Sequence, residues 1–256
     1  MRRIRPIGHD DRLSVVDHLD ELRTRLIISA IAFVAAWAFT GWQNDLVLEI
    51  VNNPLPKEVD EPITLGPAEA FYTTLTNSAY AAMLIALPVI LYQLYAFVLP
   101  AFSPSERRIA TPMLLLVPVL FITGVVFCYF VVLTPALEFL LNFNSDEFNT
   151  QVRARDYYSF VTLLMLAMGI GFQIPVGVVA ACKLGITSPD KLRRGRRYAI
   201  VGILVLASLL PTLDPVTLML EAIPLYALYE LSIVLAAAVG RPFAEVGEEP
   251  APEGSG

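Results

Sequence analysis

Two carboxylates stand among arginines in this 256-residue chain, and their setting favours binding chemistry. Glu21 lies in DHLDELRTRL (17–26), four residues before Arg25, in the order that favours an ion pair along a helix. Glu106 lies in SPSERR (103–108), at the third position of a helix-capping box. A guanidinium can pair with a carboxylate through two parallel hydrogen bonds. The two carboxylates therefore suit a cationic peptide that carries arginine.

Each carboxylate also has a purely structural explanation. An exposed i,i+4 pair with Arg25 stabilises a helix by about 0.3–0.5 kcal/mol, and capping alone accounts for Glu106. The similar helix start SPDK (188–191) has Lys191 at the equivalent position, so such a start does not require an acid there. From spacing alone, both explanations stay open.

Composition indicates which elements hold these residues. The chain is 56% hydrophobic with a mean hydropathy of +0.62, and long uncharged runs separate its clusters of charge. A helix needs about 20 apolar residues to cross the hydrocarbon core of a bilayer. We therefore predict an all-α polytopic membrane protein with a single six-helix membrane domain at 17–240. The six apolar runs are roughly 26–43, 70–99, 109–135, 157–182, 198–213 and 215–239.

The predicted helices and flanks are unequal. The fifth run has roughly 13 to 16 apolar residues, and only the turn PTLDP separates it from the sixth, so we expect both helices to be short. Residues 70–99 would extend about 45 Å as one helix, so the second helix should be long and tilted. Residues 1–16 are predicted to be a flexible cytoplasmic start, and 241–256 a disordered acidic cytoplasmic tail.

The basic residues predict the orientation. Fifteen of the 18 Lys and Arg residues precede the first helix or follow the second, fourth and sixth helices. The other side holds only Lys57, Arg153 and Arg155. The positive-inside rule then places both termini in the cytoplasm, with Glu21 and Glu106 on the same basic face.

Other function classes find little support. His9 and His18 precede the first helix and the two cysteines lie in separate apolar runs, so we predict no catalytic residues, metal or cofactor. The chain lacks G-x-S-x-G, a phosphate-binding loop and the internal repeats of many transporters, and no nucleic-acid partner is expected. The alternative that hydropathy alone allows is a six-helix secondary transporter of a small solute.

Six segments, in order, closely resemble TatC, the multi-spanning core subunit of the twin-arginine protein translocase. They are HLDELRTRL (18–26), LPVILYQLYAFVLPAFSPSERR (87–108), FCYFVVLTPALEFL (127–140), YYSFVTLLMLAMGIGFQIPV (157–176), GITSPDKLRRGRRYAIVG (185–202) and IPLYALYELSI (223–233). The resemblance implies a multi-pass receptor of the cell membrane that is not an enzyme. It would bind twin-arginine signal peptides of folded cargo, self-associate, and assemble with TatA- and TatB-type single-span partners for Sec-independent export driven by the proton-motive force.

The resemblance also implies roles for residues near the basic face. The family's signal-recognition carboxylates fall on Glu21 and Glu106, with Arg23 and Phe97 as neighbouring family positions. Phe97 would contact the hydrophobic part of the signal, although packing explains it equally well. Pro54 in NNPL matches a proline of the first outer loop and is expected to be structural.

Three further family positions are polar residues of the helices. Gln173 in GFQIPV stands where the family commonly has a glutamate implicated in docking a partner helix; its amide can form interhelical hydrogen bonds but cannot titrate near neutral pH. Asp214 matches an acidic position of expected partner contact, and it would also cap the helix at Pro215. Glu230 in YELSI matches a glutamate of the sixth helix. Glu221, about 180° around that helix, matches no motif.

Overall fold

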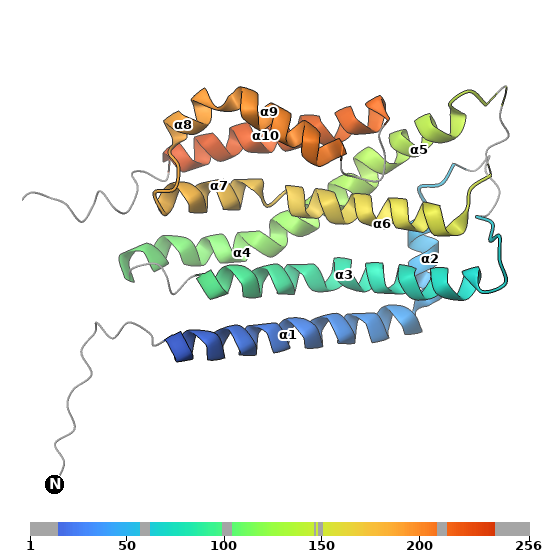
Figure 1. Ribbon diagram of the computed structural model, residues 1–256, viewed down its shortest axis with the longest axis horizontal. Coiled ribbons are helices and arrows are strands. Elements are labelled where there is room, and N and C mark those ends of the chain that lie inside the picture. Colours follow the sequence, from blue (N-terminus) through green and yellow to red (C-terminus); the bar gives the residue numbers. More distant parts are fainter. Residues whose placement is uncertain are drawn as a thin grey trace, which may run out of the picture.

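Within the described residues, each of the six apolar runs coincides with one or more helices (Figure 1). The computed structural model describes residues 15–56, 62–98, 104–145, 147, 151–208 and 214–238, with side chains from residue 18 onward except those of 104–113. The predicted flexible start and acidic tail lie outside the described residues, apart from the beginning of the first helix. The elements are α1 (Val15–Trp42), α2 (Asn44–Asn52), α3 (Glu69–Val98), α4 (Pro104–Phe127), a π-helical turn (Cys128–Val132), α5 (Leu133–Asn142), α6 (Ala154–Gly171), α7 (Ile174–Lys183), α8 (Pro189–Arg194), α9 (Arg196–Ser208) and α10 (Pro215–Ala238).

Within the described residues, five stretches are long and apolar enough to cross a membrane. They are His18–Trp42, Glu69–Val98, Leu114–Asn142, Ala154–Lys183 and Pro215–Ala238. The predicted short fifth helix is α9. Its 13 residues extend about 20 Å, which is less than the roughly 30 Å hydrocarbon core, so a sixth membrane crossing made by α9 stays a prediction. The second helix is long as predicted, because α3 has 30 residues, whereas its tilt stays a prediction.

The prediction of a short sixth helix was wrong. α10 has 24 residues, or about 36 Å of helix, which is enough to cross a bilayer. The helix begins at Pro215, where a proline needs no backbone donor, and it continues through Pro224 in its interior. A single proline in a packed, apolar helix did not end it.

Two other prolines do mark irregularities in long helices. Pro175 is the second residue of α7, and the chain leaves α6 in a short turn at Phe172 and Gln173 just before it. The π-helical turn that ends at Val132 lies immediately before α5, which contains Pro135. A proline cannot donate to the fourth carbonyl before it and clashes with that carbonyl, so the preceding turn must adjust.

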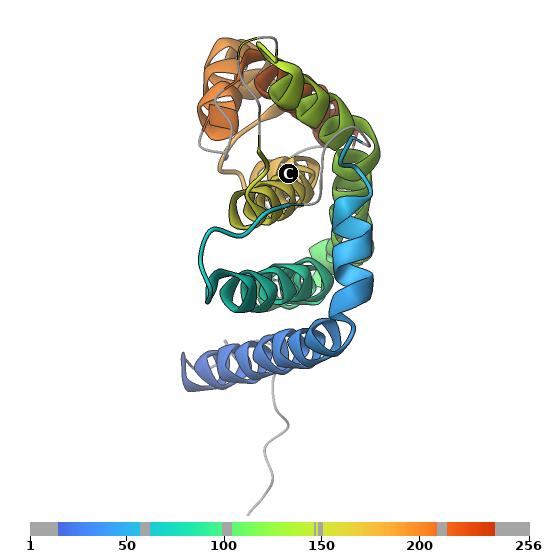
Figure 2. The same ribbon diagram turned by 90° about the vertical axis from the view of Figure 1, so that its right-hand side faces the viewer.

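The long helices lie side by side in a stack (Figure 1). α3 lies between α1 and α6, and α10 and α9 lie beyond α6, while α2 and α5 cross one side of the stack (Figure 2). We call the end that holds the first turns of α1, the last turns of α3 and the start of α4 the near end. The opposite end, with α2 and the starts of α3 and α6, is the far end.

Small residues let neighbouring helices approach closely. α1 and α3 meet at Ala36, Ala82 and Ala86, and the Thr40 hydroxyl donates to the Ser78 carbonyl oxygen of the facing helix at 2.8 Å. Such small-residue seams and interhelical hydrogen bonds replace the hydrophobic driving force where lipid surrounds the helices.

α4 and α6 meet at a pair of glycines. A methyl group added to Gly124 would lie 2.7 Å from the Met168 carbonyl oxygen, and one added to Gly169 would lie 2.6 Å from the Phe121 ring. Each glycine therefore accommodates an atom of the opposite helix. This seam continues into the main buried core formed by α5, α6 and α10.

Two features of the far end were not predicted. The nine-residue helix α2 occupies part of the segment expected to be an outer loop. Ile63 and Arg153 form a parallel β-bridge, in which Ile63 N–H donates to the Val152 carbonyl and Ala154 N–H donates to the Ile63 carbonyl, each at 2.8 Å. The first outer segment is thereby joined to the start of α6.

Candidate functional site

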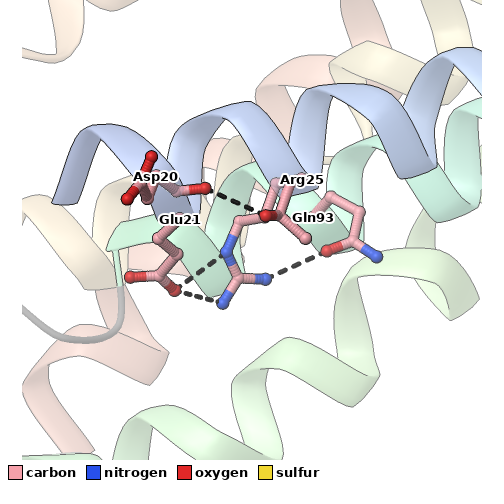
Figure 3. A network of polar contacts seen from close by, with 5 residues as sticks. Asp20, Glu21, Arg25 and Gln93 are labelled. Carbon is pink, nitrogen blue, oxygen red and sulfur yellow. Dashed lines mark hydrogen bonds and ion pairs between the residues drawn. The ribbon is translucent and has the colours of Figure 1, made fainter. Parts of the chain in front are cut away.

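Arg25 links α1 to α3 at the near end (Figure 3). Its Nε and Nη2 both donate to Glu21 Oε1, at 3.0 and 2.5 Å, and its Nη1 donates to Gln93 Oε1 at 3.0 Å. The predicted helical ion pair is confirmed, and Gln93 adds a bridge to a neighbouring helix. The Glu21 and Arg25 side chains are 26% and 23% exposed, so solvent reaches the pair.

Glu21 has one carboxylate oxygen to spare. Both bonds from Arg25 end on Oε1, while Oε2 points away from Arg25 and receives no hydrogen bond from the described residues (Figure 3). A second guanidinium can therefore bind Oε2 without displacing Arg25. This geometry gives the carboxylate both a structural partner and a free acceptor, so the two explanations of Glu21 do not exclude each other.

Phe97 lies against α1 at the same end. Its ring stacks on the imidazole of His18, with centroids 4.3 Å apart and ring planes at 19°. His18 is exposed and Phe97 is half-buried, so this aromatic pair forms part of the surface next to Glu21, three residues further along α1. The sequence placed Phe97 near this site but gave no sign of the stacking partner.

Glu106 lies at the near end by its backbone. α4 begins at Pro104, which makes Glu106 the third helical residue, as the SPSE capping pattern predicts. Its side chain is outside the described residues, and so is all of Ser103. The start of α4 faces the same end as the first turns of α1 (Figure 1).

Two further predicted residues, Arg23 beside Glu21 and Pro54 in the first outer segment, differ in exposure. Arg23 is exposed and makes no ion pair with the described residues. Pro54 is buried at the far end, just after α2, next to Asn53, whose side chain donates to the Tyr129 hydroxyl at 3.2 Å. The position of Pro54 is therefore remote from Glu21 and fits packing of the outer segment.

Known proteins resemble this chain over most of its length. The profile described as "Sec-independent protein translocase protein (TatC)" matches residues 17–224. The chain belongs to the TatC family. It is 35% identical over 227 residues to the Sec-independent protein translocase protein TatC of Escherichia coli (strain K12), covering 88% of each chain. It is 38% identical over 227 residues to the TatC protein of Aquifex aeolicus (strain VF5), covering 87% of this chain and 94% of the relative.

A solved structure agrees with this assignment. The crystal structure titled "Twin Arginine Translocase Receptor- TatC" superposes with a TM-score of 0.76 at 38% sequence identity, covering 88% of this chain and 100% of the other. The resemblance drawn from the motifs is confirmed. TatC proteins are components of a protein translocase and not enzymes.

Gln173 in the fourth apolar run is one of the polar residues predicted for partner contact. It is buried at the turn between α6 and α7, where its Nε2 donates to the Val117 carbonyl oxygen of α4 at 3.2 Å. Its Oε1 is buried and has no hydrogen-bond partner among the described residues. The amide therefore already makes one interhelical contact and keeps one acceptor.

The two acidic residues predicted from the resemblance, Asp214 and Glu230, have local partners. Asp214 Oδ1 accepts a hydrogen bond from Thr217 N–H at 2.7 Å, which confirms its role as the cap of α10. Glu230 forms a two-pronged pair with Arg196 at the start of α9, with Nε–Oε1 at 2.7 Å and Nη2–Oε2 at 2.8 Å. The Tyr226 hydroxyl also donates to Glu230 at 2.8 Å.

Glu221 differs sharply from Glu230 on the same helix. Its residue is 1% exposed, and neither carboxylate oxygen has a hydrogen-bond partner among the described residues. The separation by half a turn around α10 predicted from the sequence agrees with one buried and one partly exposed carboxylate. The pairing of Glu230 with Arg196, 34 residues away, had no sequence signal beyond the basic run that contains Arg196.

Proposed function

We propose that this protein is the signal-peptide receptor subunit of a twin-arginine translocase in the cell membrane. The observation that carries the proposal is Glu21, whose Oε2 stays available at an exposed end of the bundle beside Phe97 and the start of α4. One arginine of the signal binds Glu21 Oε2, and the other binds Glu106. The hydrophobic part of the signal then lies along Phe97.

The proposed topology has six crossings with both termini in the cytoplasm. The distribution of basic residues supports this topology, because arginines gather on the cytoplasmic side of membrane proteins. Among the described residues, six arginines of α1, α8 and α9 lie at the near end, whereas Arg153 and Arg155 lie at the far end. In this topology α9 is the short crossing. The near end then faces the cytoplasm, where a folded cargo protein presents its signal.

The proposed partners are TatA- and TatB-type single-span proteins and further copies of this chain. Partner helices need apolar surface, and α1 offers Ile27, Ile31 and Val34 exposed on its outer face, opposite the side that packs on α3. Gln173, Asp214 and Glu230 are the proposed polar positions for partner contact. The proposed cycle exports folded cargo at the expense of the proton-motive force.

Peptide binding to purified protein in detergent tests the receptor proposal. A fluorescent signal peptide with paired arginines should bind, and a Lys-Lys peptide should bind about tenfold more weakly because an ammonium cannot pair bidentately. Glu21→Gln should weaken the Arg-Arg peptide about tenfold, as expected for a lost charge-assisted hydrogen bond. Asp20→Asn is the matched control, because Asp20 is an exposed carboxylate one residue away.

Each outcome separates the receptor from the alternative transporter. Equal affinity for the Arg-Arg and Lys-Lys peptides would contradict the receptor proposal. Equal losses for Glu21→Gln and Asp20→Asn would show that general charge, and not the geometry around Arg25, governs binding. A small-solute transporter should bind neither peptide above the level of an unrelated apolar peptide.

A further inference from the structure

A polar cavity lies at the far end between α3 and α6, away from the near-end site. Its volume is about 680 Å³, within the usual range for small-molecule sites. Its rim includes Leu65 and Tyr72, which are 68% and 64% exposed, and its floor includes Thr73 and Asn77, which are 7% and 1% exposed. The cavity thus leads from the surface to buried polar side chains.

The floor carries hydrogen-bonding groups that the protein does not use. Both side-chain atoms of Asn77 and the hydroxyl of Thr73 are buried without a hydrogen-bond partner among the described residues. Buried polar groups are normally paired, and within a bilayer there is little water to serve instead. Both residues line the cavity, so a molecule in the cavity can supply their partners.

The rim carries two arginines. Arg153 and Arg155 both line this cavity, and they are two of the three basic residues predicted on this side of the membrane. Arg153 Nε contacts Glu69 Oε1 at 2.6 Å, and this hydrogen bond raises the pKa of the Arg153 guanidinium. Glu69 Oε2 accepts Leu65 N–H at 2.7 Å, so both oxygens of that carboxylate are engaged. Arg155 is exposed, and its guanidinium has no ion pair with the described residues although Asp156 follows it in the chain, so it is available to an anionic group.

The vertical order of these groups matches one kind of molecule. Along α3, Thr73 and Asn77 lie four and eight residues beyond Glu69, or about 6 and 12 Å deeper at 1.5 Å per residue. Arg155 would lie at the level of the bilayer surface, and Thr73 and Asn77 would lie deeper, at the border of the hydrocarbon. A phospholipid has its phosphate and its glycerol ester carbonyls in the same order.

We propose that this cavity binds the headgroup of a phospholipid in the leaflet at the far end, with Arg155 on the phosphate and with Thr73 and Asn77 donating to the ester carbonyls. The bridge between Ile63 and Arg153 and the Glu69–Arg153 pair hold the rim in place before the lipid arrives. The proposal requires the protein to span a membrane, but it does not depend on signal-peptide binding.

Thermal unfolding in detergent, with and without added lipid, tests this site. Phosphatidylglycerol and phosphatidylethanolamine should each raise the Tm of the wild-type protein, because a ligand that binds the folded state stabilises it. Diacylglycerol, which has the esters without the phosphate, should give less than half of that rise. Inorganic phosphate alone should give none, and a full rise with phosphate would overturn the lipid assignment in favour of a free anion.

Two variants probe the rim and the floor, with one control. Arg155→Gln should reduce the lipid-induced rise at least twofold, and native mass spectrometry should show correspondingly less bound phospholipid. Asn77→Leu should be at least as stable as wild type without lipid, because an unpaired buried amide is gone, and should lose most of the lipid response. Arg194→Gln, an exposed arginine at the near end, should behave as wild type.

The same variants define what would overturn the proposal. A full lipid response in both Arg155→Gln and Asn77→Leu would show that phospholipid binds elsewhere. A twin-arginine peptide that loses affinity in Asn77→Leu while the lipid response stays intact would assign the cavity to the peptide. If Asn77→Leu does not fold, Arg155→Gln decides the outcome alone, since this exposed side chain carries no packing.

Discussion

The two ends of the bundle use the same chemical pair in different ways. At the near end, Glu21 and Arg25 are four residues apart on one helix, and the pair leaves Glu21 Oε2 open. At the far end, Glu69 and Arg153 are 84 residues apart, and both oxygens of Glu69 are engaged. A carboxylate paired within one helix can accept a ligand without loss of tertiary structure. A carboxylate that joins two segments cannot be released without separating them.

Reversing the charge of Glu69, at the far end, should have the largest effect, and this effect is on thermal stability. Glu69→Arg places two guanidinium groups together and removes the acceptor of Leu65 N–H, so we expect Tm in detergent to fall by several degrees. The double variant Glu69→Arg/Arg153→Glu should recover part of the loss.

The exposed local pair Asp190–Arg193, with its atoms 3.6 Å apart, provides the control for this experiment. Asp190→Asn should leave Tm unchanged, because such surface pairs contribute little. If Glu69→Arg unfolds at the wild-type temperature, the Glu69–Arg153 pair does not hold the two segments together, and the contrast with the Glu21–Arg25 pair is wrong.

The near-end carboxylate on α4 should give the next largest effect. Glu106→Gln keeps a side chain that can complete the capping box, so Tm should stay near wild type while the affinity for an Arg-Arg peptide falls about tenfold. Glu106→Ala should lose affinity similarly and also lower Tm slightly. Fluorescence anisotropy and thermal unfolding measure the two properties separately. Wild-type affinity in Glu106→Gln combined with failure of Glu106→Ala would favour capping as the only role of Glu106.

Local features of both ends were predictable from the sequence. The caps at Ser188 and Asp214 were found in their patterns, and the structure confirms them, with Ser188 Oγ accepting Lys191 N–H at 3.3 Å. The i,i+4 pair of Glu21 is confirmed for the same reason. Helix periodicity and capping depend on residues within one turn of each other, which a single sequence displays directly.

Contacts between distant segments were not predictable. Nothing in the sequence joins Glu69 to Arg153, which was predicted only as one of three outer basic residues, although the two side chains pair at 2.6 Å. The stacking of His18 on Phe97 and the pairing of Arg196 with Glu230 likewise join separate helices. Such pairs depend on which helices become neighbours, and a sequence without related sequences carries little information on that choice. The length of α10 was misjudged because the short fifth run and the brief turn after it were taken to apply to the sixth helix as well, although the sixth apolar run itself covers 215–239.

The aromatic surface beside Glu21 should contribute less than the carboxylates. Phe97→Leu removes the stack with His18 and should weaken a full signal peptide about threefold, or about 0.7 kcal/mol. A peptide cut to the arginine region should bind both proteins equally. Phe71→Leu on the same helix is the matched control, because Phe71 is exposed at the far end. Unchanged binding in Phe97→Leu with a lower Tm would assign Phe97 to packing.

The smallest expected effect concerns Arg25, whose positive charge on Glu21 Oε1 repels a signal-peptide arginine that binds the free Oε2 of the same carboxylate. Arg25→Gln removes an exposed helical pair worth about 0.3–0.5 kcal/mol, so affinity for the Arg-Arg peptide should rise about twofold. Gln93→Leu, which detaches Arg25 from α3 but keeps its charge, should change affinity less. Titration calorimetry on the three proteins would detect the difference. If Arg25→Gln instead weakens binding severalfold, Arg25 positions Glu21 for the ligand. The Glu21–Arg25 pair would then hold its carboxylate in a fixed place, as the Glu69–Arg153 pair does at the far end.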